Sequence, residues 1–150
     1  MFAKAVIAGA LALIMGAVIA AAGASAGSAR EGEVLRFGVR FGDDLVDHAP
    51  TGPSVGDQLI VHDTVVKGGR KVGSDAGVCT FASVQPQIAS CVITFRLPRG
   101  QIAVQFANTP PPRKRAAIVG GTGRYRDARG ELRILERPDQ TGRLAFHLSA

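Results

Sequence analysis

Apolar and polar side chains alternate along almost the whole chain from residue 35 onwards. In the first alternating stretch, Leu35, Phe37 and Val39 fall on one face of an extended backbone. Arg36 and Arg40 fall on the opposite face. A period of two residues is typical of β-strands with one buried and one solvated face, and very little of the sequence repeats every three or four residues as a helix would. This pattern restricts the chain to β-sheet architectures.

Eight segments show the alternation, and most are joined by connections of hairpin length. They are residues 35–41, 57–66, 74–81, 91–97, 101–107, 116–119, 129–136 and 143–148. We predict an all-β fold, a single eight-stranded antiparallel up-and-down β-barrel formed by residues 27–150. A β-sandwich is the alternative. We prefer the barrel because only the proline-rich stretch around Pro110-Pro-Pro112 is long enough to cross between two sheets.

A glycine-rich segment, residues 119–130, joins the sixth and seventh of these strands. Gly120, Gly121 and Gly123 favour a tight turn, because glycine reaches positive φ angles without a Cβ clash. A phosphate-binding loop would need a Lys-Ser/Thr pair or a helix directly after the glycines, and the sequence has neither. We therefore interpret the segment as a structural turn between two strands.

The first 26 residues have the form of a secretory signal peptide. Lys4 precedes an uncharged run from Ala5 to Ala26, which ends in the small-x-small sequence Ala24-Ser25-Ala26. We expect cleavage after Ala26, export from the cell and no stable membrane anchor thereafter. The alternative is a retained anchor, since about 20 apolar residues can span a bilayer.

The chain carries a formal net charge of +6, but its positive residues are scattered at alternate strand positions. The exception is the triplet Arg113-Lys114-Arg115, which we assign to the proline-rich loop. Nucleic-acid binding favours a concentrated basic stripe or aromatic side chains that stack on bases, and neither is evident. We therefore expect no nucleic-acid partner.

The only two cysteines, Cys79 and Cys91, lie twelve residues apart in two predicted neighbouring strands. If those strands pair in antiparallel fashion, the two sulfur atoms can face each other. Export favours a disulfide, which would stabilise the fold by about 2–3 kcal/mol. The alternative is a pair of buried free thiols that pack as small hydrophobic groups.

No nucleophilic triad or metal site is evident, because the three histidines lie far apart in the sequence and no Gly-x-Ser-x-Gly motif occurs. Asp63 is the most unusual ionisable residue, since it shares a strand face with Val61 and Val65. A carboxyl group on an apolar face has a raised pKa unless a cation pairs with it. Asp63 is therefore a candidate functional residue, or a structural one if it pairs with Arg40 or Arg96.

Three further polar residues have two interpretations each. Asp43 and Asp44 follow the first strand, where they lie at the barrel rim or simply cap a turn. Gln105 lies on a strand face that points either to solvent or to a polar lumen. Tyr125 follows the glycine turn and is expected to pack with its hydroxyl group at the edge of the core.

Five motifs resemble, in order, those of the allene oxide cyclase-like and dirigent-like barrel proteins. They are Val55-Gly-Asp57, Gly69-Arg-Lys-Val-Gly73, Ala76-Gly-Val-Cys-Thr80, Gly100-Gln-Ile-Ala-Val-Gln105 and residues 117–130. The resemblance implies an eight-stranded antiparallel barrel that holds a hydrophobic small molecule in its lumen and needs no cofactor. Cyclases of this group steer a reactive intermediate into one ring stereoisomer, and dirigent proteins guide stereoselective coupling. Such catalysis depends on orientation and on a few polar groups that stabilise developing charge.

The resemblance also implies roles for individual residues. Asp63 and Cys79 fall at positions in or near the cavity of the cyclases, and Gln105 matches a Gln on one of their strands. Asp43 or Asp44 matches the acidic residue that follows the first dirigent strand. This sequence also departs from the cyclases, because Gly38 and Arg40 stand in place of their first-strand Glu and Asn.

We therefore expect a secreted, cofactor-free barrel that binds a hydrophobic small molecule and directs its cyclisation or coupling. Asp63 and Asp44 are the expected acid–base or charge-stabilising groups. The residues expected to contact the ligand are Arg40, Cys79, Arg96, Gln105 and Tyr125. A non-catalytic carrier resembling lipocalins and a barrel filled by its own side chains are the alternatives. A homo-oligomer is consistent with the resemblance, because relatives of this fold often form trimers.

Overall fold

The computed structural model describes residues 32–110 and 112–149, so the predicted signal peptide lies outside the described residues. The described part of the chain consists of ten β-strands connected by turns and loops. Their bounds are β1 Val34–Arg40, β2 Asp43–Val46, β3 Gln58–Val61, β4 Thr64–Lys67, β5 Arg70–Val84, β6 Gln87–Leu97, β7 Gly100–Asn108, β8 Arg113–Gly123, β9 Arg129–Glu136 and β10 Thr141–Ser149. Within residues 32–110 and 112–149, no helix is long and apolar enough to cross a membrane.

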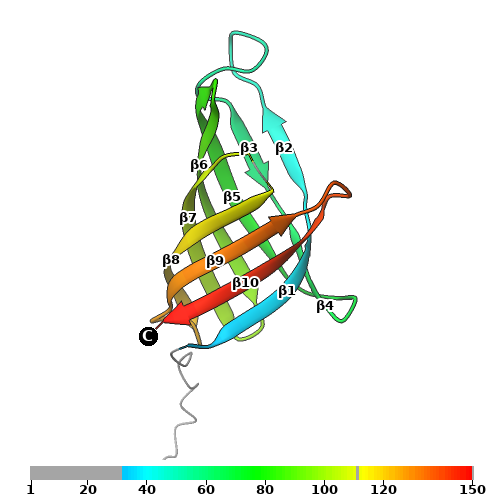
Figure 1. The fold of residues 1–150 in the computed structure, drawn as a ribbon, viewed down its shortest axis with the longest axis vertical. Coiled ribbons are helices and arrows are strands. Elements are labelled where there is room, and N and C mark those ends of the chain that lie inside the picture. Colours follow the sequence, from blue (N-terminus) through cyan, green and yellow to red (C-terminus); the bar gives the residue numbers. More distant parts are fainter. Residues whose placement is uncertain (1–31, 111, 150) are drawn as a thin grey trace, which may run out of the picture.

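The strands form a closed antiparallel ring (Figure 1). Hydrogen bonding runs from β5 through β4, β1, β10, β9, β8, β7 and β6, and β6 pairs again with β5. The two remaining strands, β2 and β3, extend the sheet at the upper end of the ring. β3 pairs with the upper part of β5, and β2 pairs with β3. The prediction of an eight-stranded up-and-down barrel is therefore confirmed. The sandwich alternative is wrong, because consecutive hydrogen-bonded ladders close the sheet on itself.

The strand predicted over residues 57–66 is interrupted in the structure at His62-Asp63, between β3 and β4. A similar break at Phe41-Gly42 separates β1 from β2. The breaks lie side by side, because the His62 N–H donates to the Gly42 carbonyl oxygen over 2.8 Å. The segment from Asp43 to Val46 continues a strand, whereas the sequence placed Asp43 and Asp44 after the strand's end.

The lower part of the barrel is filled by apolar side chains. Five of its largest members are almost fully buried: Phe95, Phe146, Ile102, Leu132 and Leu144. Phe146 packs edge-on against both Phe95 and Phe37, with ring centroids 5.1 and 6.2 Å apart respectively. Such edge-to-face contacts add to the stabilisation that burial gives.

The glycine-rich segment closes the lower end, and its interpretation as a structural turn is confirmed. Its first glycines end β8, and residues 124–128 turn the chain into β9. Gly100 has a φ of +155°, and a Cβ atom there would overlap the Thr122 carbonyl oxygen. Tyr125 lies beneath this contact and is buried, and its hydroxyl group donates to the Pro98 carbonyl oxygen over 3.0 Å. Its predicted packing role is confirmed.

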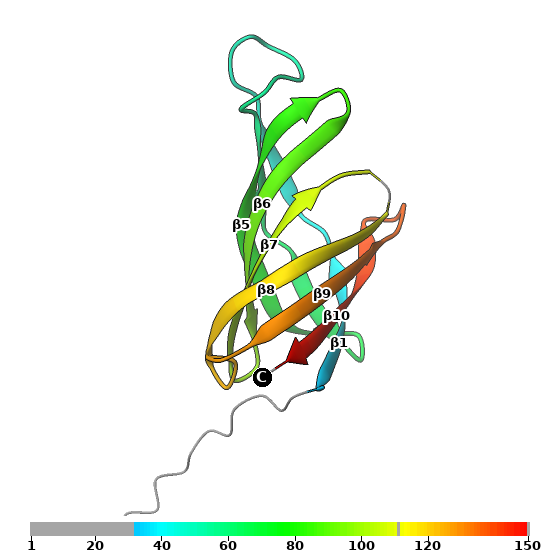
Figure 2. The ribbon, with the colours of Figure 1, turned by 60° about the vertical axis from the view of Figure 1, so that its left-hand side comes forward.

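The upper end of the barrel is open. The long strands β5 and β6 project beyond β9 and β10, as Figures 1 and 2 show, and Gln105 is the last residue of β7 that pairs with β8. The loop from residue 47 to 57 also lies at this end. The buried Asp57 carboxylate fixes the loop by accepting hydrogen bonds from the His48 and Ser54 N–H groups, over 3.0 and 2.7 Å. These bonds hold the pKa of Asp57 below its ordinary value.

Candidate functional site

The open end leads into two adjoining cavities. The inner chamber has a volume of about 340 Å³ and lies among apolar side chains that include Val61, Phe95 and Leu144. The outer chamber has a volume of about 590 Å³ and lies at the mouth, beside Pro110, Pro112 and Pro138. Both fall in the range of volumes typical of small-molecule sites. The alternative of a barrel filled throughout by its own side chains does not match this arrangement.

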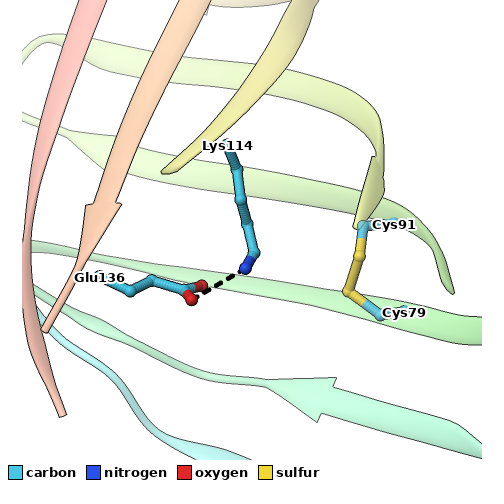
Figure 3. The surroundings of a disulfide bond; sticks show 4 residues. All are labelled: Cys79, Cys91, Lys114 and Glu136. Atoms are coloured by element: carbon cyan, nitrogen blue, oxygen red, sulfur yellow. Dashed lines mark hydrogen bonds and ion pairs between the residues drawn. A yellow bond between two sulfur atoms is a disulfide. The ribbon is translucent and has the colours of Figure 1, made fainter. Parts of the chain in front are cut away.

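Six residues line both chambers and therefore mark the neck between them. These are Leu59, Cys79, Asn108, Lys114, Glu136 and Arg137. The Lys114 ammonium group donates to Glu136 Oε2 over 2.8 Å, and its side chain is only 9% exposed. Figure 3 shows Lys114 extending from β8 toward Glu136 at the end of β9, with the disulfide to one side. The neck therefore carries an ion pair inside a largely apolar barrel.

The disulfide between Cys79 and Cys91 joins β5 to β6 at the neck (Figure 3). The two residues are direct partners in the antiparallel register, with Cα atoms 4.0 Å apart, and both are buried. The predicted disulfide is thus confirmed, and the free-thiol alternative is not. Cys79 is also confirmed as a cavity-lining position.

Asp63 lines the inner chamber, on the inward face that its alternation with Val61 and Val65 predicted. Its side chain lies at the strand break, where Asp63 Oδ1 accepts a hydrogen bond from the Gly42 N–H over 2.9 Å. Asp63 itself is 7% exposed. The interruption between β3 and β4 thus places a carboxyl group in the apolar chamber and fixes it through the backbone of the neighbouring strand break.

Asp75 on β5 is the immediate neighbour of Asp63. The Asp63 N–H donates to Asp75 Oδ1 over 2.7 Å, and the Asp75 N–H donates to the Asp63 carbonyl oxygen over 3.1 Å. Asp75 is 5% exposed, and its Oδ2 is buried without a hydrogen-bond partner among the described residues. Two carboxyl groups therefore lie together beside the inner chamber.

This environment favours protonated carboxyl groups. Burial and, next to it, the negative charge of Asp75 together raise the pKa of Asp63 to about 7, while the hydrogen bond from the Gly42 N–H acts in the opposite direction. Burial also raises the pKa of Asp75, against hydrogen bonds from Asp63 that lower it. A carboxyl group that titrates near neutral pH is able to donate or accept a proton under physiological conditions.

The chain matches the family model described as an allene oxide cyclase barrel-like domain over residues 40–146. This protein belongs to that family. The match includes both halves of the neck ion pair, the disulfide, Asp63 and Asp75. No curated protein sequence matches the chain significantly.

Several solved structures resemble this allene oxide cyclase barrel-like protein. A pyocyanin demethylase superposes with a TM-score of 0.69 and 27% identity, covering 78% of this chain and 100% of that chain. The pterocarpan synthase dirigent protein PsPTS1 gives a TM-score of 0.58 at 19% identity, covering 81% and 99% respectively. The Diels Alderase AbmU from Streptomyces koyangensis gives 0.64 at 16% identity, covering 79% and 69%. The latter two show a shared fold.

Several predicted site residues of this family member lie away from the chambers. Arg40, Arg96 and Gln105 are exposed and point outward, since they alternate with the inward-facing Val39, Phe95 and Val104. No ion pair between Asp63 and an arginine occurs in the described part of the chain. The expectation of an arginine beside Asp63 is therefore wrong. Asp63 instead forms hydrogen bonds with the Gly42 N–H and with Asp75.

Asp44 and Tyr125 also lie outside the two chambers. Asp44 is exposed at the rim, where its Oδ2 lies 3.1 Å from His62 Nε2. This contact raises the pKa of His62. Tyr125 lies at the closed end of the barrel, opposite the mouth. Of the seven predicted site residues, only Asp63 and Cys79 line the chambers.

Sequence reasoning missed several polar residues of the site, among them Asp75, Lys114 and Glu136. A signal for Asp75 exists, because it lies four residues before Cys79 and thus on the same strand face. Lys114 was assigned to a loop, whereas Arg113-Lys114-Arg115 begins β8 and only its middle residue points inward. In the described residues, no group of three or more His, Cys, Asp or Glu side chains could hold a metal ion.

Proposed function

We propose that this protein binds a hydrophobic small molecule in the inner chamber and directs its cyclisation or coupling, with Asp63 as the proton-transferring residue. One observation carries the proposal: a carboxyl group with a pKa near 7 lies in the wall of a cavity that apolar side chains such as Val61, Phe95 and Leu144 also line. The likeness to barrels described as a demethylase, a pterocarpan synthase dirigent protein and a Diels Alderase supports a role in transforming small molecules.

The proposed mechanism combines orientation with proton transfer. The apolar walls restrict the ligand to a few conformers and exclude water, so that a reactive group meets its partner in one geometry. The protonated Asp63 donates to an oxygen that gains negative charge, or its carboxylate stabilises positive charge that develops on the ligand. These two uses depend on the same group in opposite protonation states, which a pKa near neutrality allows.

We also propose that the protein is exported and that its leader is removed after Ala26. The disulfide between Cys79 and Cys91 is consistent with an extracellular location, because disulfides persist in oxidising compartments. The intact mass of protein collected from the medium of the producing cells would identify both the mature amino terminus and the oxidised cysteines. A mature form that retains residues 1–26 would contradict the proposal.

The substitution Asp63→Asn tests the function. Native mass spectrometry of protein purified from its own cells first identifies small molecules that co-purify with it. These compounds are then tested as substrates. We expect Asp63→Asn to lower the rate of product formation at least a hundredfold while ligand affinity stays within about threefold, because general acid–base catalysis contributes about 10²–10⁴-fold.

Asp127→Asn is the matched control, since Asp127 is exposed at the closed end of the barrel. It should leave both the rate and the affinity unchanged. If the protein binds the compound without converting it, it is a carrier. If Asp63→Asn leaves the product distribution and rate as in the wild type, Asp63 has no catalytic role. Either result contradicts the proposal.

A further inference from the structure

Asp75 is the least explained polar side chain of the barrel. It lies on the inward face of β5, directly opposite Phe95 on β6, and it is 95% buried by its exposed fraction of 5%. Its Oδ1 accepts the Asp63 N–H over 2.7 Å, but Oδ2 is buried with no hydrogen-bond partner in the described residues. A buried carboxylate oxygen without a partner is costly unless a proton or a cation compensates it.

No ion pair with Asp75 occurs among the described residues. Arg40, which is opposite Thr64, and Arg96, which is opposite Ser74, are both exposed on the outside of the barrel. Both neighbours of Asp75 along its strand face are small or apolar, and its cross-strand partner is aromatic. A proton is therefore the remaining source of compensation, and Asp63 is the group that shares it.

Other ionisable groups face the pair from the surrounding elements. Asp43 on β2 adds negative charge near Asp63, and His62 lies beside the pair and lowers the pKa of Asp75. Three more line the inner chamber with Asp63: Lys114, Glu136 and Arg137. Lys114 and Glu136 neutralise each other through their 2.8 Å contact. None of these groups replaces a proton between the two aspartates.

We propose that Asp75 and Asp63 share a single proton, and that Asp75 is thereby a positioning residue that sets the charge Asp63 presents to the inner chamber. A second negative charge in this buried pair is disfavoured, so the two carboxyl groups together keep one proton up to neutral pH. The two reciprocal backbone hydrogen bonds hold the carboxyl groups in this arrangement. The proton sharing rests on the burial and adjacency of the two aspartates, and only its use in catalysis rests on the proposed function.

The test is a titration by NMR of protein labelled with ¹³C at the aspartate carboxyl carbons. In the wild type, we expect the signals of both Asp63 and Asp75 to respond to the step near pH 7. In Asp75→Asn, the Asp63 signal should titrate in a single step at least one pH unit lower, a tenfold change in its acid dissociation constant. The amide keeps an acceptor for the Asp63 N–H, so a purely structural role of Asp75 predicts no such shift.

The reciprocal variant Asp63→Asn keeps the test decisive if Asp75→Asn does not fold. In Asp63→Asn, the response of the Asp75 signal near pH 7 should disappear, leaving one step at lower pH. Asp127→Asn serves as the control and should leave both signals unchanged. An Asp63 step that stays near pH 7 in Asp75→Asn, or an Asp75 signal that ignores that step in the wild type, would overturn the inference.

The pH dependence of turnover separates this inference from the proposed function. If Asp63 acts as the acid, the loss of rate at high pH should move in Asp75→Asn by the same amount as the NMR midpoint. A shifted NMR midpoint with an unshifted rate profile supports the shared proton and contradicts a catalytic role for Asp63.

Discussion

At the scale of single residues, the position of Asp63 follows from alternation alone. Its neighbours Val61 and Val65 are inward, and a strand places every second side chain on one face. The same rule places Arg40 and Arg96 outside, so the expected pairing with Asp63 was ruled out by the parity of their own strands. Alternation does not show which residues of neighbouring strands lie opposite each other. For this reason the contact between Asp63 and Asp75 was not predicted.

The raised pKa of Asp63 predicts that stability depends on pH. The folded protein binds this proton more tightly than an unfolded chain, in which the pKa is near 3.8. The unfolded state is therefore favoured increasingly as pH rises from 5 to the folded value near 7, and the free energy of unfolding falls. The contribution of Asp63 is at most about 3 kcal/mol over this range, at about 1.4 kcal/mol per pKa unit.

Denaturant unfolding at pH 5, 6, 7 and 8 measures this dependence. At pH 8, Asp63→Asn should be more stable than the wild type. Its free energy of unfolding should also fall less steeply between pH 5 and 8. The raised pKa values of His62 and Asp75 act in the same direction, so a residual slope is expected in the variant. An identical slope in the two proteins would show that Asp63 is not protonated in the folded state.

At the scale of elements, the two-residue alternation of apolar and polar side chains predicted where the strands lie but not the residues at which they begin and end. The proline run correctly marked a loop, but β8 begins at Arg113, three residues earlier than the predicted strand at Ala116. Arg113-Lys114-Arg115 has the composition of a solvated loop, and only its place in the barrel turns Lys114 inward to Glu136. The break at His62-Asp63 was also not predicted, because it interrupts the ladder without interrupting the alternation that includes Val61, Asp63 and Val65.

The disulfide links β5, the longest strand, covalently to β6. Replacing both cysteines, Cys79→Ala with Cys91→Ala, should lower the free energy of unfolding by about 2–3 kcal/mol, since the bond closes a short loop in the unfolded chain. Urea unfolding of this variant and of reduced wild-type protein should give matching midpoints. Oxidised and reduced wild-type protein that unfold at the same urea concentration would contradict a stabilising role.

At the scale of the whole molecule, the barrel has two unlike ends. Glycines let β7, β8 and the Tyr125 turn pack closely at the lower end, and aromatic contacts fill the space above them. At the upper end the lumen is open. It is surrounded there by the long hairpin of β5 and β6, the paired strands β2 and β3, and the proline-rich connection between β7 and β8. The fold and the disulfide could be predicted from sequence, whereas the chambers could not, because an unfilled volume depends on side-chain packing in three dimensions. Homo-oligomer formation stays a prediction, to be measured by the solution mass of the mature protein.

We expect the inner chamber to bind an apolar small molecule. The most direct measurement compares Val61→Trp, which fills the chamber, with Val92→Trp, which adds the same side chain to the outer face of β6, where Val92 is 50% exposed. Binding of the neutral fluorescent probe N-phenyl-1-naphthylamine is titrated against both variants and the wild type, after their folding is checked by circular dichroism. We expect Val61→Trp to bind the probe at least tenfold more weakly, a loss of about 1.4 kcal/mol, and Val92→Trp to bind it as the wild type does. Equal binding by the two variants, or no binding by the wild type, would contradict it.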